Sequence, residues 1–85
     1  MLIKKHPTAV VHGDTTFLVW VCGEGRIDGT WEGWLEFHPI DSSQPVLVTE
    51  QETSQANRAA LEYWADGLEP VYLEGAFGRA HARPL

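Results

Sequence analysis

The sequence predicts an α+β fold made of a four-stranded antiparallel β-meander, one α-helix near residues 54–66 and a fifth strand near residues 71–75. One arrangement of these elements is a small, partly closed barrel. The first half of the chain has β-branched and aromatic runs separated by glycine-containing turns, and the second half has apolar residues at spacings of three and four. A chain of 85 residues is expected to form one domain, residues 1–85, around a single small core.

The strand-like runs and the turns between them define the meander. Gly13-Asp14 predicts a tight hairpin between the first two strands, and Asp28-Gly29 predicts the turn before the third. Pro39 should end the third strand, because proline has no N–H to donate to a sheet. The expected strands cover residues 8–12, 15–22, 30–38 and 46–49.

A helix is expected after the meander, with Thr53 or Ser54 as its N-cap and several alanines as strong helix formers. Its apolar side consists of Leu61, Trp64 and Leu68. Gly67 and Pro70 mark its end, since proline cannot continue a helix. The apolar run that follows favours the fifth strand.

Residues 30–38 have two different side-chain faces, because successive strand residues point to opposite sides of a sheet. Pairing His12 with Thr15, and Cys22 with Thr30, gathers apolar residues of the first three strands on one side. A slip of one residue would scatter them over both sides, so this agreement supports the pairing. The side that collects them is the expected core face.

In this register Gly33 stands opposite Val19 and leaves a gap in the core face. A bulky side chain of the helix should fill that gap. Trp64 is our candidate, because it lies on the apolar side of the expected helix.

The other face of the sheet is too apolar to meet water alone. The second strand has no polar alternation between Phe17 and Cys22, which is typical of a strand covered on both sides. One helix covers only one face, so the second face must be covered by closure of the barrel, by the fifth strand and the carboxyl-terminal tail, by a second copy of the chain, or by a ligand or another protein. The residues that define this face are Leu18, Trp20, Glu32, Trp34 and Glu36.

The function that this face favours is that of a small non-enzymatic protein which acts through protein contact, as a homodimer that uses the surface around Trp20 and Trp34. An alternative is a binding module for a cationic peptide or a small amine, held by the ring of Trp34 between Glu32 and Glu36.

The net charge of −6 is concentrated in the body of the chain, while the ends, residues 1–6 and 79–85, are basic and are expected to be poorly ordered. An acidic body disfavours nucleic acid as a ligand, although it also suggests a decoy that imitates nucleic acid toward a basic protein. The longest apolar run, residues 17–22, is too short to cross a bilayer, and the single Cys22 excludes an internal disulfide. We therefore expect a cytoplasmic protein without membrane contact.

No convergent acid, base and nucleophile emerge, so neither enzyme activity nor a cofactor is expected. Glu32 and Glu36 would lie about 13 Å apart along one strand, which is too far for a pair of catalytic carboxylates. The one candidate set for a metal is His12, Asp14 and His38, which the register brings to neighbouring strand ends.

Overall fold

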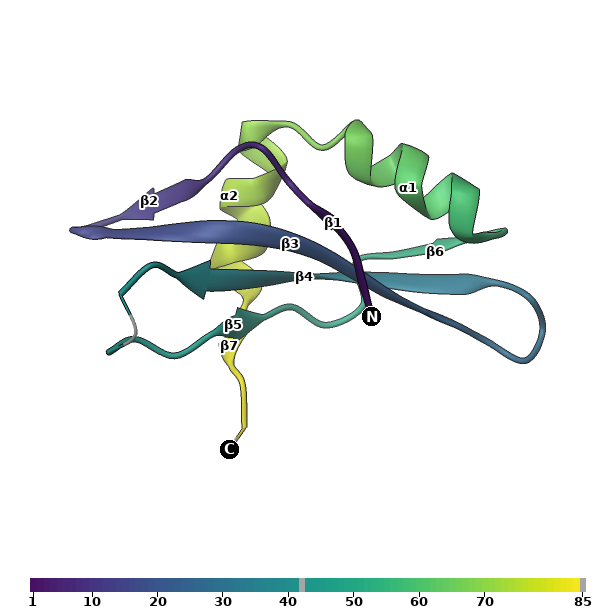
Figure 1. The fold of residues 1–85 in the computed structure, drawn as a ribbon, viewed down its shortest axis with the longest axis horizontal. Coiled ribbons are helices and arrows are strands. Elements are labelled where there is room, and N and C mark those ends of the chain that lie inside the picture. Colours follow the sequence, from purple (N-terminus) through teal and green to yellow (C-terminus); the bar gives the residue numbers. More distant parts are fainter. Residues whose placement is uncertain (42, 85) are drawn as a thin grey trace.

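The computed structural model describes residues 1–41 and 43–84, and this part of the chain folds as one seven-stranded sheet with two helices (Figure 1). The α+β fold is confirmed, and the described strands do not close into a barrel. The strands are β1 Leu2–Lys5, β2 Val10–His12, β3 Thr15–Gly25, β4 Trp31–Pro39, β5 Leu47–Val48, β6 Thr53–Gln55 and β7 His81–Ala82. The helices are α1 Arg58–Asp66 and α2 Pro70–Arg79.

The predicted meander is present as β2, β3, β4 and β5, each antiparallel to the next. His12 pairs with Thr15 as expected, but Cys22 pairs with Trp34 and not with Thr30. The hairpin of β3 and β4 is therefore longer than predicted, because β3 continues to Gly25 before the chain turns. The resulting shift is four residues, an even number, so every side chain keeps the face that the sequence assigned to it.

The remaining strands extend the sheet beyond the meander. Its main order is β1-β3-β4-β5-β7, with β2 also on β3 and β6 also on β4. Both ends of the chain, which we expected to be poorly ordered, carry strands β1 and β7. The amino-terminal group of Met1 also donates to the carbonyl of Gly23 at 2.7 Å. Backbone pairing to β3 and β5 thus places residues 2–5 and 81–82 in the sheet.

Helix α1 begins later than predicted and ends where predicted. Its N-cap is Asn57, whose side-chain oxygen accepts a hydrogen bond from the backbone N–H of Ala60 at 2.8 Å. Thr53 and Ser54, the expected caps, lie instead in the short strand β6. The helix ends before Gly67, whose N–H bonds to the carbonyls of the last turn.

The predicted fifth strand at residues 71–75 is wrong, because these residues belong to α2. Pro70 stands in the first turn of that helix, where a missing N–H costs nothing and the fixed φ angle is already helical. Leu73 and Ala76 are fully buried and face the sheet. Proline thus separates two helices here, and does not separate a helix from a strand.

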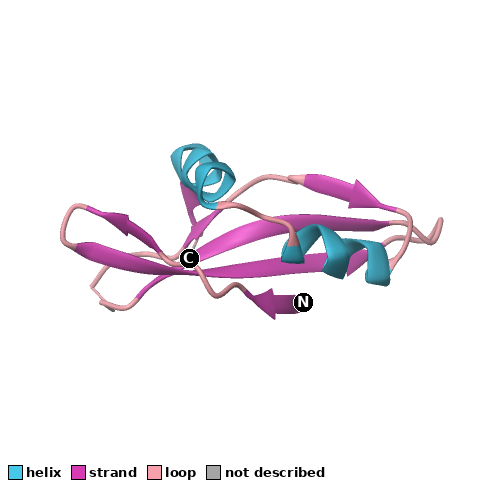
Figure 2. Ribbon diagram, turned by 90° about the horizontal axis from the view of Figure 1, so that it is seen from above, coloured by secondary structure: helices cyan, strands magenta, loops and turns pink. Residues whose placement is uncertain are grey.

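Both helices pack on the same face of the sheet, at different positions along its length (Figure 2). Under α1, the two methyl groups of Leu61 pack directly on Gly23 and Gly33. A Cβ atom at Gly23 would lie only 2.5 Å from one of them, and a Cβ atom at Gly33 only 2.6 Å from the other. Leu61, and not Trp64 as predicted, therefore fills the gap at Gly33. Under α2, the ring of Phe77 lies edge-on against Phe37, with 5.2 Å between the ring centres.

Candidate functional site

The residues predicted to form the second face do share one face of the sheet. In the observed pairing Leu18 stands opposite His38, Trp20 opposite Glu36, and Cys22 opposite Trp34. The side chains that alternate with them point into the core beneath the two helices. We call this surface the open face, and its defining residues are Leu18, Trp20, Glu32, Trp34, Glu36 and His38.

The carboxylate of Glu36 lies at the centre of the open face and accepts hydrogen bonds from three side chains. One oxygen, Oε1, lies 2.9 Å from His38 Nε2 and 2.5 Å from a guanidinium nitrogen of Arg83, while Oε2 accepts from Trp34 Nε1 at 3.2 Å. Burial would raise the pKa of Glu36, but these hydrogen bonds outweigh it and lower the pKa below its usual value. Glu36 is thus held as an anion within the surface.

Trp20 is enclosed by polar side chains and not by a second apolar layer. Its ring stacks on the imidazole of His38, with 3.7 Å between ring centres and 22° between planes, and the ammonium of Lys5 lies 5.1 Å from the ring centre. The indole N–H of Trp20 is buried and has no hydrogen-bond partner in the described part of the chain. The ring of Trp20 is therefore covered by the imidazole of His38 and the ammonium group of Lys5.

Cys22 lies beneath the same network and is only 4% exposed. Burial and the neighbouring Glu36 carboxylate raise the pKa of its thiol to about 12. The thiol therefore stays protonated at neutral pH and is a poor nucleophile. Cys22 therefore behaves as a small buried apolar residue.

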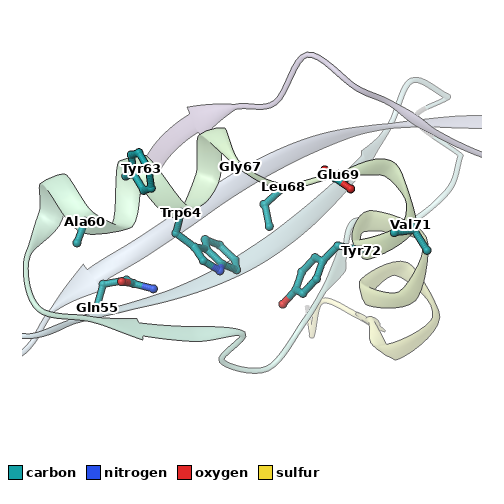
Figure 3. A pocket seen from close by; sticks show the side chains of 9 residues that line it. All are labelled: Gln55, Ala60, Tyr63, Trp64, Gly67, Leu68, Glu69, Val71 and Tyr72. Carbon is teal, nitrogen blue, oxygen red and sulfur yellow. The ribbon is translucent and has the colours of Figure 1, made fainter.

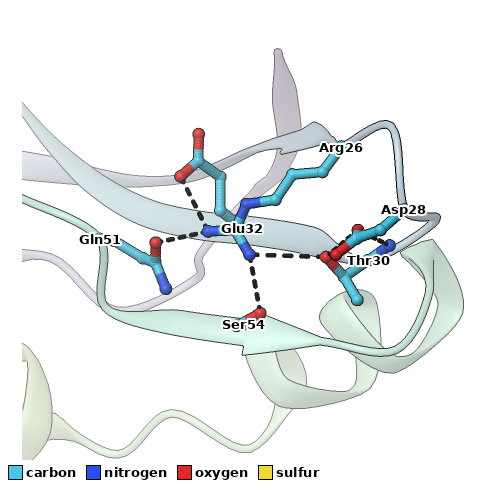
Figure 4. A network of polar contacts seen from close by, with 6 residues as sticks. All are labelled: Arg26, Asp28, Thr30, Glu32, Gln51 and Ser54. Carbon is cyan, nitrogen blue, oxygen red and sulfur yellow. Dashed lines mark hydrogen bonds and ion pairs between the residues drawn. The ribbon is translucent and has the colours of Figure 1, made fainter.

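Glu32 belongs to a separate network at the other end of the open face (Figure 4). The guanidinium of Arg26 lies 3.2 Å from the Glu32 carboxylate and donates to Gln51 at 2.5 Å and to Ser54 at 3.0 Å. Trp34, in contrast, donates to Glu36. Glu32 and Glu36 consequently do not act together around the ring of Trp34.

The three candidate metal ligands lie apart. The ring of His12 contacts Phe77 of α2, with 5.2 Å between ring centres, whereas His38 is stacked on Trp20 at the opposite face of the sheet. The four-residue shift of the register also moves His38 away from Asp14 and places it beside Leu18. Among the described residues, no group of three or more His, Cys, Asp or Glu side chains is arranged to hold a metal ion.

Part of the open face is exposed apolar surface. Leu18 is 47% exposed and Val11, on the adjacent strand β2, is 70% exposed. Sequence alternation predicted the position of Leu18, but it missed Lys5 and Arg83, which cover the centre of the face. Both come from chain ends that we expected to be poorly ordered, so only the pairing of β1 and β7 could have revealed them.

A groove of about 750 Å³ on the helical side was also missed, because it exists only where α2 replaces the predicted strand. Neither helix in the described residues is long and apolar enough to span a membrane. The chain matches no protein-family model, no curated protein and no solved structure.

Proposed function

We propose that this chain is a non-enzymatic, cytoplasmic protein that acts through protein contact, as a homodimer formed by the open face. One observation carries the proposal: both helices pack on the same side of the sheet, and the opposite side keeps exposed apolar residues next to the Trp20 and Glu36 cluster. A face of this kind is typical of an interaction surface. Two-fold association of identical chains is the commonest way to cover one.

The charge of the open face supports pairing with a second copy. Strand pairing and side-chain contacts place three cationic and three acidic residues there, namely Lys5, Arg26, Arg83, Glu24, Glu32 and Glu36. A fourth acidic residue, Glu50, lines the same hollow as Glu32 and Trp34, so these residues carry a net charge of −1 (three cationic minus four acidic). The chain as a whole carries −6. Two copies therefore repel each other less through this nearly balanced face than through the rest of their surface.

The size of the face also suits a dimer. The molecule measures 41 × 29 × 18 Å along its principal axes, and the sheet runs along the longest of them (Figure 1). A standard protein interface needs roughly 800 Å² from each partner. A broad sheet face in a molecule of this size provides an area of that order.

The contacts favour this function over binding of a cationic ligand at Trp34. Such a ligand would need the two predicted carboxylates to be free beside the ring, but Arg83 pairs with Glu36 and Arg26 pairs with Glu32. The chain's own guanidinium groups thus occupy the positions that the ligand would take. The single buried cysteine and its protonated thiol fit a non-enzymatic role in a reducing compartment.

Sedimentation velocity tests the homodimer. We expect the wild-type chain to sediment as a dimer at micromolar concentration, and Leu18→Lys to sediment as a monomer because it inserts a charge into the apolar part of the interface. This substitution makes the chain less acidic, so dissociation could not result from greater repulsion between acidic bodies. The proposal would be overturned if the wild-type chain remained monomeric up to about 100 µM. A dissociation constant of that size corresponds to weak association, with a free energy on the order of −5 kcal/mol.

The matched control is Val71→Lys, which adds the same charge at an exposed apolar residue of α2, on the helical side. It should leave the dimer intact. Equal dissociation by Val71→Lys and Leu18→Lys would show that the open face is not the interface.

A further inference from the structure

The groove on the helical side lies between α1, the linker that leads to α2, and strand β6 (Figure 3). Its volume of about 750 Å³ is within the usual range for binding sites. The residues that line it are Gln55, Ala60, Tyr63, Trp64, Gly67, Leu68, Glu69, Val71 and Tyr72. It is separate from the open face, because both helices lie on the other side of the sheet.

The aromatic walls of the groove are held in place. Trp64 and Tyr72 meet edge to face, with 6.0 Å between ring centres and 89° between planes. The hydroxyl of Tyr72 donates to the Glu52 carboxylate at 2.6 Å, and Arg79 pairs with the same carboxylate at 2.5 Å. A site whose walls are already ordered loses little entropy when a ligand binds.

The rim of the groove is apolar and open to solvent. Tyr63 is 83% exposed and Val71 is 75% exposed, and they stand on α1 and α2 respectively. In Figure 3, Trp64 and Leu68 point into the space between the helices, and Tyr72 forms its far side. An apolar side chain of a partner therefore finds aromatic surface both inside the groove and at its edges.

The charge around the groove selects a basic partner. Its one charged lining residue is Glu69, which has no ion-pair partner in the described part of the chain. Five carboxylates and three cations lie on the helices or in contact with them, namely Glu52, Glu62, Asp66, Glu69, Glu74, Lys4, Arg58 and Arg79. Aromatic faces beside an unpaired carboxylate are a favourable setting for a Lys or Arg side chain.

We propose that this groove binds a peptide segment of a partner protein in which a bulky apolar side chain adjoins a lysine or arginine. The apolar side chain enters the space beside Trp64 and Leu68, and the basic group lies between the aromatic rim and Glu69. A second copy of the chain does not fit this site, because it would bring another acidic body against an acidic surface. The groove therefore serves a different partner from the open face.

Selection from a phage-displayed library of random 12-residue peptides on the full-length chain tests this proposal. We expect the enriched peptides to combine a bulky apolar residue with Lys or Arg and to bind with micromolar affinity. Their affinity should fall about fivefold in Glu69→Gln and more than tenfold in Val71→Lys, which places a like charge at the rim. Neither change should unfold the chain, since Glu69 makes no capping hydrogen bond and Val71 is exposed.

Leu18→Lys is the matched control, because it alters the open face and should leave peptide affinity unchanged. Absence of enriched peptides, enrichment of acidic or purely apolar peptides, or equal affinity for the wild type and both groove variants would each overturn the proposal. Dimerisation of the wild-type chain that is abolished by Val71→Lys but not by Leu18→Lys would show that a second copy occupies the groove, and it too would overturn the proposal. None of these outcomes depends on whether the chain dimerises through the open face.

Discussion

The two faces of one sheet differ in what holds them together, although they are formed by alternate residues of the same strands. On the helix-covered face Val19, Val21, Leu35 and Phe37 are almost completely buried. On the open face most of their neighbours are partly exposed, and the central side chains are joined by hydrogen bonds and ion pairs to Glu36. Apolar burial stabilises the first face, whereas a polar network orders the second and leaves apolar surface available for contact.

The largest expected effect is loss of the Leu61 side chain on the helix-covered face. Leu61 is fully buried and occupies the space above Gly23 and Gly33. Leu61→Ala should lower the free energy of unfolding by about 3 kcal/mol, because it leaves a cavity between α1 and the sheet. Urea unfolding followed by tryptophan fluorescence measures the change.

A double-mutant cycle sharpens this test. Gly33→Ala alone should destabilise the chain, since its Cβ would lie 2.6 Å from Leu61 and 3.0 Å from Thr53. In the double variant Gly33→Ala/Leu61→Ala the new methyl group enters the vacated space, so the combined cost should be smaller than the sum of the two. Strict additivity would show that Leu61 does not fill the gap at Gly33.

On the open face, the largest effect is expected from Glu36→Gln. The neutral amide cannot replace the carboxylate as acceptor for Trp34, His38 and Arg83 together, so the free energy of unfolding should fall by about 2 kcal/mol. Glu24→Gln is the control, because Glu24 is exposed on the same face. Equal costs for the two variants would contradict the central role of Glu36.

The pH dependence of the same variant gives an independent readout. The pKa of Glu36 is lowered from its ordinary value of 4.5, so the native chain binds a proton here less readily than the unfolded chain. The stabilisation is present above pH 4.5 and is lost as the pH falls through the lowered pKa. Stability should therefore decline less steeply with acid in Glu36→Gln than in the wild type, as measured by urea unfolding between pH 5 and pH 3, roughly the range in which carboxylates titrate.

The sequence predicted which residues share a face, because strand alternation has a period of two and an error of four residues in the register does not change the face. It could not predict α2. The residues after Pro70 include Val71, Tyr72 and Leu73, which also suit a strand, and proline occurs both after one helix and in the first turn of the next. Tertiary packing of Leu73 and Ala76 on the sheet decides for the helix.

The candidate site was predictable in position but not in chemistry. Alternation placed Trp20, Trp34 and Glu36 together, and it suggested an apolar surface with two free carboxylates. In the structure Arg26 pairs with Glu32, Arg83 pairs with Glu36, and Lys5 lies over the ring of Trp20. Lys5 and Arg83 are distant in sequence and reach the face only because β1 and β7 join the sheet. No local pattern reports a contact between residue 36 and residue 83.

Truncation of Leu18 and of Val19, two neighbouring residues of β3, should have smaller and unequal effects on the free energy of unfolding. Leu18 points to the open face and is 47% exposed, whereas Val19 points to the core and is buried. Below the concentration at which the chain dimerises, Leu18→Ala should change the free energy of unfolding by no more than about 0.5 kcal/mol, and Val19→Ala should lower it by at least about 1 kcal/mol. Dilute urea unfolding compares them, and a large cost for Leu18→Ala in the monomer would show that its own chain covers the open face.

A small effect is also expected from Trp20→Phe, and it distinguishes the two tryptophans of the open face. Trp20 buries an indole N–H that has no partner in the described residues, while the N–H of Trp34 bonds to Glu36. Phenylalanine at position 20 removes the unpaired donor but also some packed surface, so the two effects should nearly cancel and change the free energy of unfolding by less than about 1 kcal/mol. Trp34→Phe loses the same surface together with a charge-assisted hydrogen bond, so it should cost about 1.5 kcal/mol, less than Glu36→Gln because only one of the three contacts to Glu36 is lost. If urea unfolding gave the reverse order, the N–H of Trp20 would have an acceptor after all, and stacking on His38 would not be the contact that orders this part of the face.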